Sequence, residues 1–274
     1  LFLVLTSLQN GSVLLDSRSF DFIGQDEIQN LFFESDPDKI GLVKIFFAFR
    51  WVIFINDIEL AKAFLPESAY SLPKSDLPEK HPSKTFFGKG VFFTNGDLWA
   101  RQRKLASLAF HRALCPKMTG ECTNDFITLL TKWTNTPIDA FSLMQRLIIQ
   151  ILGRAAFAYD MKALDSLEEK PYILKIYSKI FNHLTDPSFS IFPFLSSLPL
   201  KKNLEHSLLT KEFDKFLLKI IDKRRCDLSR AENNENNTDL LAGLLEAANQ
   251  ERYNYTNKEL RDEIATYFVA GHDS

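Results

Sequence analysis

The C-terminal stretch ELRDEIATYFVAGHDS (Glu259–Ser274) has the pattern of an amphipathic helix with an unusual end. Thr256 and Glu259 have the spacing of a capping box, which predicts that the helix begins close to Asn257. Apolar residues then recur at steps of three and four, as expected for one face of a helix. They are Leu260, Ile264, Tyr267, Phe268 and Gly271.

Gly271 lies on this apolar face although glycine costs about 1 kcal/mol relative to alanine inside a helix. Either the helix ends there, or another group must lie close against its backbone. Asp273 favours the second interpretation, because an acidic residue is unfavourable at the C-terminal end of a helix. An acid followed by an alcohol, Asp273 and Ser274, can also pass protons, although such pairs are common.

A second stretch, GVFFTNGDLWARQRKLASLAF (90–110), predicts a helix that Asp97 can cap. Leu98, Leu105 and Ala109 form its core stripe, and Trp99, Arg103 and Ala106 form a neighbouring stripe. Trp99 and Arg103 are four residues apart, so an indole N–H and a guanidinium lie together and can hold an anion. The alternative is a core tryptophan beside a solvated face that contains Arg101, Arg103 and Lys104.

The composition is that of a folded chain. Hydrophobic residues make up 45% of the 274 residues, with 25 phenylalanines, and the net charge of −2 argues against nucleic-acid binding. The three cysteines, Cys115, Cys122 and Cys226, are too scattered for a disulfide framework and indicate a reducing compartment. The initial LFLVLTSL is far shorter than the ~20 residues that cross a bilayer. It is either the stub of a removed anchor or a core segment.

The order of elements predicts a mainly α fold with a small N-terminal β-sheet. KIGLVKIFFAF and RWVIFIN (39–49 and 50–56) indicate a hairpin between short helices at 26–35 and 57–65, the latter ending before Pro66. A long loop, rich in proline and glycine, is expected from Pro66 to Gly96. Further helices are expected near 98–111, 117–134, 139–160, 172–184, 201–228, 239–250 and 257–274. Between them, Thr185–Leu200 is an apolar, proline-rich break, either tucked into the core or facing a membrane.

Together these stretches resemble the cytochrome P-450 family of haem–thiolate monooxygenases. GKGVFFTNGDLWARQRKLASLAF is similar to the family segment that runs into W-x-x-x-R, here Trp99 and Arg103. AGHDS is similar to its oxygen-site motif (A/G)-G-x-(D/E)-(T/S), here Ala270 to Ser274. The resemblance covers the whole chain and corresponds to the N-terminal half of a microsomal-type member. It implies that residues 1–274 are a single incomplete domain, truncated within the oxygen-site helix, with the C-terminal haem–thiolate half absent.

The resemblance implies roles for individual residues. Trp99 and Arg103 would bind a haem propionate, and Ala270 and Gly271 would let the helix backbone approach the haem. Asp273 and Ser274 would be the catalytic pair that delivers protons.

The loop before the second stretch also acquires a role from the resemblance. Val91 and Phe92 would lie over the substrate pocket. Arg101 and Lys104 would belong to the surface on which an acidic redox partner docks, and Phe189–Leu200 would dip into the membrane.

The implied activity is the insertion of one oxygen atom from O2 into a small lipophilic substrate, with electrons from an NADPH-dependent reductase. The implied location is the cytosolic face of the endoplasmic reticulum membrane. The family's iron is held by a cysteine in F-x-x-G-x-R-x-C-x-G, and none of the three cysteines has that context. This chain is therefore expected to be inactive alone. Ala270, where members that oxidise the terminal carbon of fatty acids often have Glu, disfavours that branch.

Two other interpretations remain. His111, Cys115 and Cys122 have spacings that suggest zinc, but a fourth ligand is not evident, so no metal site is predicted. The chain can also be a non-catalytic helical fragment, derived from truncation or from a pseudogene, that acts at most as an interaction module.

Overall fold

The computed structural model describes residues 3–8, 11–16, 41–47, 50–55, 57–71, 73–74, 79–113, 116–131, 139–165, 171–230, 239–249 and 255–273. The strands are β1 (Leu3–Leu8), β2 (Gly11–Asp16), β3 (Leu42–Phe47) and β4 (Arg50–Ile55). The longer helices are α2 (Ile58–Ser71), α4 (Gly96–Ala113), α5 (Pro116–Thr131), α6 (Ala140–Ile151), α7 (Tyr172–Leu184), α9 (Lys201–Arg230), α10 (Leu240–Asn249) and α11 (Asn257–Asp273). The shorter ones are α3 (Pro82–Phe87), the π-helix η2 (Leu152–Ala156), α8 (Pro187–Ile191) and the 3-10 helix η3 (Pro193–Ser197).

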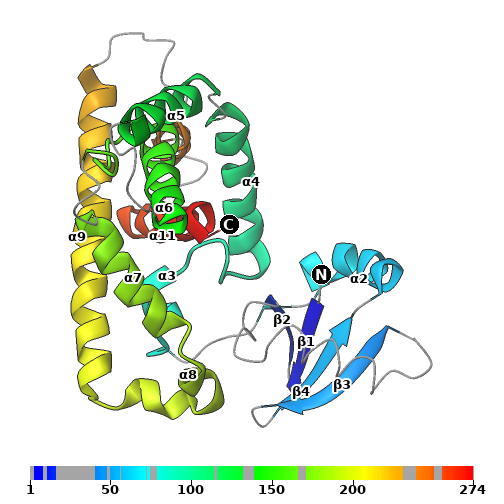
Figure 1. Ribbon diagram of the computed structural model, residues 1–274. Coiled ribbons are helices and arrows are strands. Elements are labelled where there is room, and N and C mark those ends of the chain that lie inside the picture. Colours follow the sequence, from blue (N-terminus) through cyan, green and yellow to red (C-terminus); the bar gives the residue numbers. More distant parts are fainter. Residues whose placement is uncertain are drawn as a thin grey trace.

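The four strands form one antiparallel sheet in the order β2-β1-β4-β3, beside the helical part of the molecule (Figure 1). The predicted hairpin is confirmed, since β3 pairs with β4 and Leu42 lies opposite Ile55. The initial apolar segment contains β1, which pairs with both β2 and β4. Among the described side chains of β3 and β4, those of Val43, Phe54 and Ile55 are buried. The observed fold is thus mainly α with a small N-terminal sheet, as predicted.

Most predicted helices are confirmed, but the region between 57 and 96 differs from expectation. α2 does not end before Pro66; it continues to Ser71. Proline removes one backbone donor and costs about 3 kcal/mol within a helix, so this cost is outweighed here. The predicted loop also contains α3, which begins at Pro82 and is capped by His81, whose Nδ1 accepts from the Ser83 N–H at 3.2 Å. A proline in the first helical turn is favourable, because its missing N–H has no partner there in any case. The helix predicted at 26–35 lies outside the described residues.

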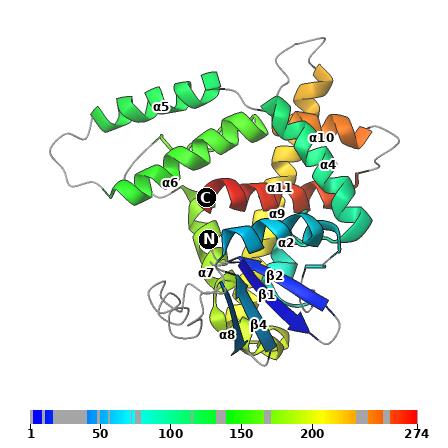
Figure 2. The same ribbon diagram turned by 90° about the vertical axis from the view of Figure 1, so that its right-hand side faces the viewer.

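α11 occupies the centre of the helical part, between α9 and α4 (Figures 1 and 2). Its capping box is confirmed: the Glu259 N–H donates to Thr256 Oγ1 at 3.2 Å, and the Thr256 N–H donates to Glu259 Oε2 at 2.8 Å. The predicted apolar face packs into the main core, where Phe268 is fully buried against Phe213 and Tyr177 at ring-centroid distances of 5.1 and 5.4 Å.

The break at 185–200 folds into α8 and η3, and the expectation that it is tucked into the core is met in part. Phe189 is buried and contacts the ring of His183, with 4.7 Å between centroids. Large apolar side chains just beyond it are exposed, namely Phe192, Phe194, Leu198 and Leu200. Within the described residues, no helix combines the length and the apolarity needed to cross a bilayer.

Candidate functional site

The first turns of α4 present the predicted anion-binding pair. Trp99 is half-buried, Arg103 is exposed, and Ala106 behind them is buried. The structure adds a cation that the sequence did not indicate, since Lys74 Nζ lies 5.4 Å from the centroid of the Trp99 ring. We call Lys74, Trp99 and Arg103 the cationic cluster. Nothing in the local pattern around Lys74 signalled this contact, because it joins segments with no shared periodicity.

Lys74 is held in place by the backbone on the N-terminal side of α4. Its Nζ donates to the carbonyls of Val91 and Thr94 at 2.8 and 3.1 Å. Its backbone N–H donates to Asn95 Oδ1 at 2.7 Å. Burial, and then the positive charge of Arg103, lower the pKa of Lys74 to about 8. A bound anion would oppose both effects, so the cluster is suited to a carboxylate or a phosphate.

A buried acid lies on the side of α11 that faces this cluster. Glu263 is 0% exposed, and its Oε1 lies 3.5 Å from the Tyr255 hydroxyl. Burial raises the pKa of Glu263 to about 7. Interactions with Tyr267, the Val91 N–H and Tyr255 favour the ionised carboxylate and lower the pKa, but by less than burial raises it. Electrostatic interactions couple Glu263 to Lys74, and Tyr267 to Arg103.

The same face of α11 continues to the glycine. Glu263, Tyr267 and Gly271 are four residues apart and therefore lie in one row along the helix. The Tyr267 ring also contacts Phe110 of α4, with centroids 5.2 Å apart. The middle of the row therefore faces α4.

Ala270 and Gly271 are exposed at the end of this row. α11 continues beyond Gly271 to Asp273, so the glycine does not end the helix. A β-carbon at Gly271 would lie 2.8 Å from a methyl of Leu152, in the π-helix η2. His272 points away from this surface and is buried against Tyr177, with ring centroids 4.9 Å apart. The side chain of Asp273 and all of Ser274 lie outside the described residues.

The predicted substrate residues lie in the segment Gly88–Thr94, which we call the pocket loop. Val91 is half-buried and packs against the main core. Phe92 is 58% exposed, and its ring contacts Phe93 and Phe87 at centroid distances of 5.0 and 6.4 Å.

Two further cations of α4, Arg101 and Lys104, differ in their surroundings. Arg101 forms an ion pair with Glu259 at 2.5 Å and lies over the Tyr255 ring at 5.4 Å. It therefore links α4 to the start of α11 within the molecule. Lys104 is exposed.

Comparison with known proteins gives one consistent family. The sequence profile of the family described as "Cytochrome P450" matches residues 19–274. "Cytokinin hydroxylase" of Arabidopsis thaliana is 27% identical over 223 residues, which are 80% of this chain and 42% of that protein. "Cytochrome P450-DIT2" of Saccharomyces cerevisiae is 28% identical over 262 residues, which are 92% of this chain and 51% of that protein. The chain spans about half the length of the curated relatives it matches.

Solved structures with the same fold agree with this result. The crystal structure of the cytochrome P450DA heme domain has a TM-score of 0.70 at 16% identity. The match covers 93% of this chain and 54% of that structure's chain. A cytochrome P450 described as CYP102L1 has a TM-score of 0.68 at 20% identity. The match covers 90% of this chain and 56% of that structure's chain.

Proposed function

Because the chain belongs to the cytochrome P450 family, we propose that it builds one side of the haem pocket of a monooxygenase that inserts one oxygen atom from O2 into a small lipophilic substrate. The observation that supports this most directly is the cationic cluster beside the row Glu263, Tyr267 and Gly271. The chain also shares the fold of haem-domain structures over most of its described length.

The residues present fit haem at two places. Lys74, Trp99 and Arg103 combine two cations with an indole N–H, which is a donor set suited to propionate carboxylates. Ala270 and Gly271 offer an exposed stretch of helix with almost no side chain, where a flat macrocycle can lie close to the backbone. In this proposal the cationic cluster holds the propionates, and Ala270 and Gly271 line the face of the ring.

Bound haem would supply the iron at which O2 is activated. The remaining roles belong to this chain. Asp273 would exchange protons with solvent through its carboxyl group, and the Ser274 hydroxyl would hold or pass a proton in the same network. Val91 and Phe92 of the pocket loop would contact the substrate and exclude water.

None of the three cysteines lies in the family's thiolate motif. We therefore propose that residues 1–274 form one incomplete domain, and that the iron ligand comes from the part of the relatives that this chain does not match. A reductase that uses NADPH would supply electrons, and Lys104 is an exposed cation on which an acidic partner can dock. The exposed apolar side chains of Phe192, Phe194, Leu198 and Leu200 support contact with the endoplasmic reticulum membrane.

The test is the ferrous–carbon monoxide difference spectrum of the complete protein. We expect a Soret band with the red shift of a thiolate ligand, and oxygenation of a lipophilic substrate when a reductase is added. A complete protein that takes up no haem would overturn the proposal. A non-catalytic interaction module remains the second candidate, supported by the lack of the cysteine motif, and turnover by residues 1–274 alone would reject it.

A further inference from the structure

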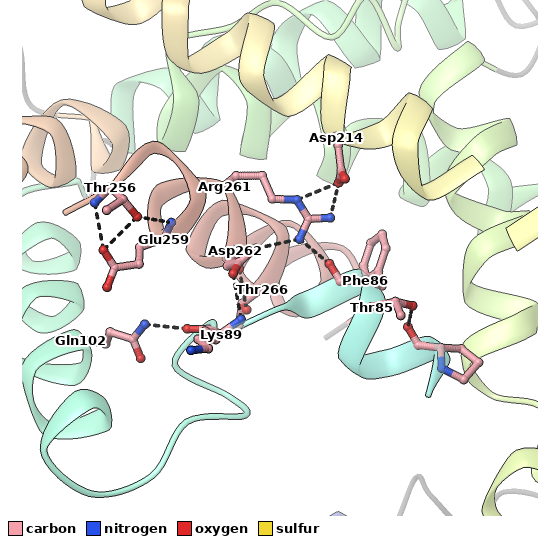
Figure 3. A network of polar contacts seen from close by, with 11 residues as sticks. Thr85, Phe86, Lys89, Gln102, Asp214, Thr256, Glu259, Arg261, Asp262 and Thr266 are labelled. Carbon is pink, nitrogen blue, oxygen red and sulfur yellow. Dashed lines mark hydrogen bonds and ion pairs between the residues drawn. The ribbon is translucent and has the colours of Figure 1, made fainter. Parts of the chain in front are cut away.

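The pocket loop lies directly on the first half of α11, where it is held by buried charged groups (Figure 3). The Lys89 N–H donates to Asp262 Oδ2 at 2.8 Å, although the two residues are 173 positions apart. Gly88, at φ +57°, has the left-handed conformation that favours glycine, and a β-carbon there would overlap the Asp262 carboxylate. The start of the pocket loop, at Gly88 and Lys89, therefore packs directly against the Asp262 side chain of α11.

The Arg261 guanidinium bridges the Asp262 carboxylate and the C-terminal end of α3 through hydrogen bonds. Its Nη1 donates to Asp262 Oδ1 at 3.0 Å and to the Phe86 carbonyl at 2.5 Å. The same guanidinium forms an ion pair with Asp214 of α9. Asp262 is 2% exposed and Arg261 is 6% exposed. Hydrogen bonds within a buried charged pair of this kind are strong, and losing one partner is costly.

The other side of the loop is held by α4. Gln102, which is fully buried, donates from Nε2 to the Lys89 carbonyl at 2.6 Å. Its Oε1 accepts from the Thr94 hydroxyl at 2.5 Å. Gly90 has no room for a side chain, because a β-carbon would overlap Thr266 Oγ1 of α11. Lys89 and Thr94 are thus both anchored, and Val91 and Phe92 lie between the anchors.

From this geometry we propose that Asp262, oriented by Arg261, is a positioning residue that sets where Val91 and Phe92 hold the substrate. The same helix carries Ala270, Gly271 and Asp273 further along. The contact from Lys89 to Asp262 would therefore fix the pocket loop relative to the end of α11 that carries Gly271 and Asp273. This inference rests on the proposed function in treating Val91 and Phe92 as substrate contacts.

Two readouts test the proposal. The first is amide hydrogen–deuterium exchange in residues 1–274, which needs no cofactor. Asp262→Asn keeps the shape of the side chain but removes its charge, and we expect exchange at Lys89 to become about tenfold faster, with helical amides of α9 unchanged. Asp97→Asn, at an exposed carboxylate in the first turn of α4, is the matched control and should change nothing. Unchanged exchange at Lys89 in Asp262→Asn would overturn the inference.

The second readout uses the haem-loaded complete protein. We expect Asp262→Asn to raise KM about tenfold and to shift the ratio of oxygenated products, with kcat changed less than about twofold. Asp262→Glu, which retains the carboxylate, should restore part of the product ratio, whereas a merely structural role would change the amount of folded enzyme and not the ratio. Faster Lys89 exchange with an unchanged product ratio would overturn the positioning role and leave the proposed function standing. Absence of oxygenation by the unchanged complete protein would overturn both.

Discussion

Lys74 Nζ lies 5.4 Å from the centroid of the Trp99 ring, and this contact brings a second cation to the guanidinium of Arg103. The distance is within the range of a cation–π interaction. Burial, and then the charge of Arg103, disfavour the protonated form of Lys74, so an anion bound beside the two cations would be stabilising.

Replacing Arg103 with alanine should weaken haem binding by the complete protein. A hydrogen bond to a charged group contributes about 1.5–3 kcal/mol, so we expect roughly a tenfold to hundredfold increase in the dissociation constant. Lys74→Met should have an effect in the same direction. Haem transfer to a competing acceptor measures this. Lys104→Ala, an exposed cation on the same helix, is the control. Equal haem retention in Arg103→Ala and Lys104→Ala would contradict the assignment.

A bulky side chain at Ala270 should prevent haem uptake without unfolding the chain. Ala270 is exposed, so Ala270→Phe meets no core packing and should change the free energy of unfolding by less than about 1 kcal/mol. The same ring would occupy the surface on which we place the macrocycle. Ala63→Phe, at an exposed position of α2, is the matched control and should leave haem uptake intact. Haem absorbance together with thermal unfolding separates the two effects, and normal uptake by Ala270→Phe would reject the placement.

The aromatic core around α11 should be the main source of stability in the helical part. Phe268 is fully buried against Phe213 and Tyr177. Phe268→Ala should therefore lower the free energy of unfolding by about 3–5 kcal/mol through lost burial and a residual cavity. Phe92→Ala, at a 58% exposed position, should cost less than about 1 kcal/mol. Denaturant unfolding measures the free energy of unfolding of both variants. A similar loss in Phe268→Ala and Phe92→Ala would contradict the burial of Phe268 in the core.

Acid should destabilise the junction of α3, α7 and α9, where three histidines are buried. The rings of His183 and His206 stack 4.5 Å apart, and burial is the first cause that lowers the pKa of His81 and of His206 to about 4. Burial, and then the positive charge of Lys202, also lower the pKa of His183, whereas Asp186 opposes this shift. The folded state thus binds fewer protons than the unfolded state, whose histidines titrate near 6.5. Their contribution is fully present above about pH 6.5 and is lost as the pH falls toward 4.

Urea unfolding at stepped pH values checks this expectation. His206→Leu should make the dependence of stability on pH between 6.5 and 4 less steep, because it removes one proton-binding group of the unfolded state. An unchanged slope would contradict the burial of these rings.

The contribution of Glu263 to stability should depend on pH in the opposite direction. Burial raises its pKa to about 7 from 4.5, so the folded state holds a proton that the unfolded state has already lost. Its contribution to stability is fully present below about pH 4.5 and is lost as the pH rises to 7. Glu263→Gln should therefore match the unchanged protein at pH 4.5 and be more stable by about 2–3 kcal/mol at pH 8. Equal stability at both pH values would mean that Glu263 is ionised in the fold.

The local sequence determined the helices because their signals act over a few residues. The capping box of Thr256 and Glu259 predicted the start of α11, and apolar periodicity predicted α7 and α9 nearly to their ends. The same periodicity indicated that Trp99 and Arg103 share a helix face. The continuation of α2 past Pro66 and the helix α3 were missed, because proline and glycine mark breaks only on average.

Only the tertiary structure decided which distant segments contact these helices. Lys74 reaches Trp99, and Lys89 reaches Asp262 across 173 positions, through loops that carry no repeating pattern. Whether Glu263 holds its proton also depends on burial beneath Tyr255 and Tyr267, since desolvation is set by the whole fold. Periodicity records which face of an element is buried, whereas partners between distant segments follow from how those faces pack together.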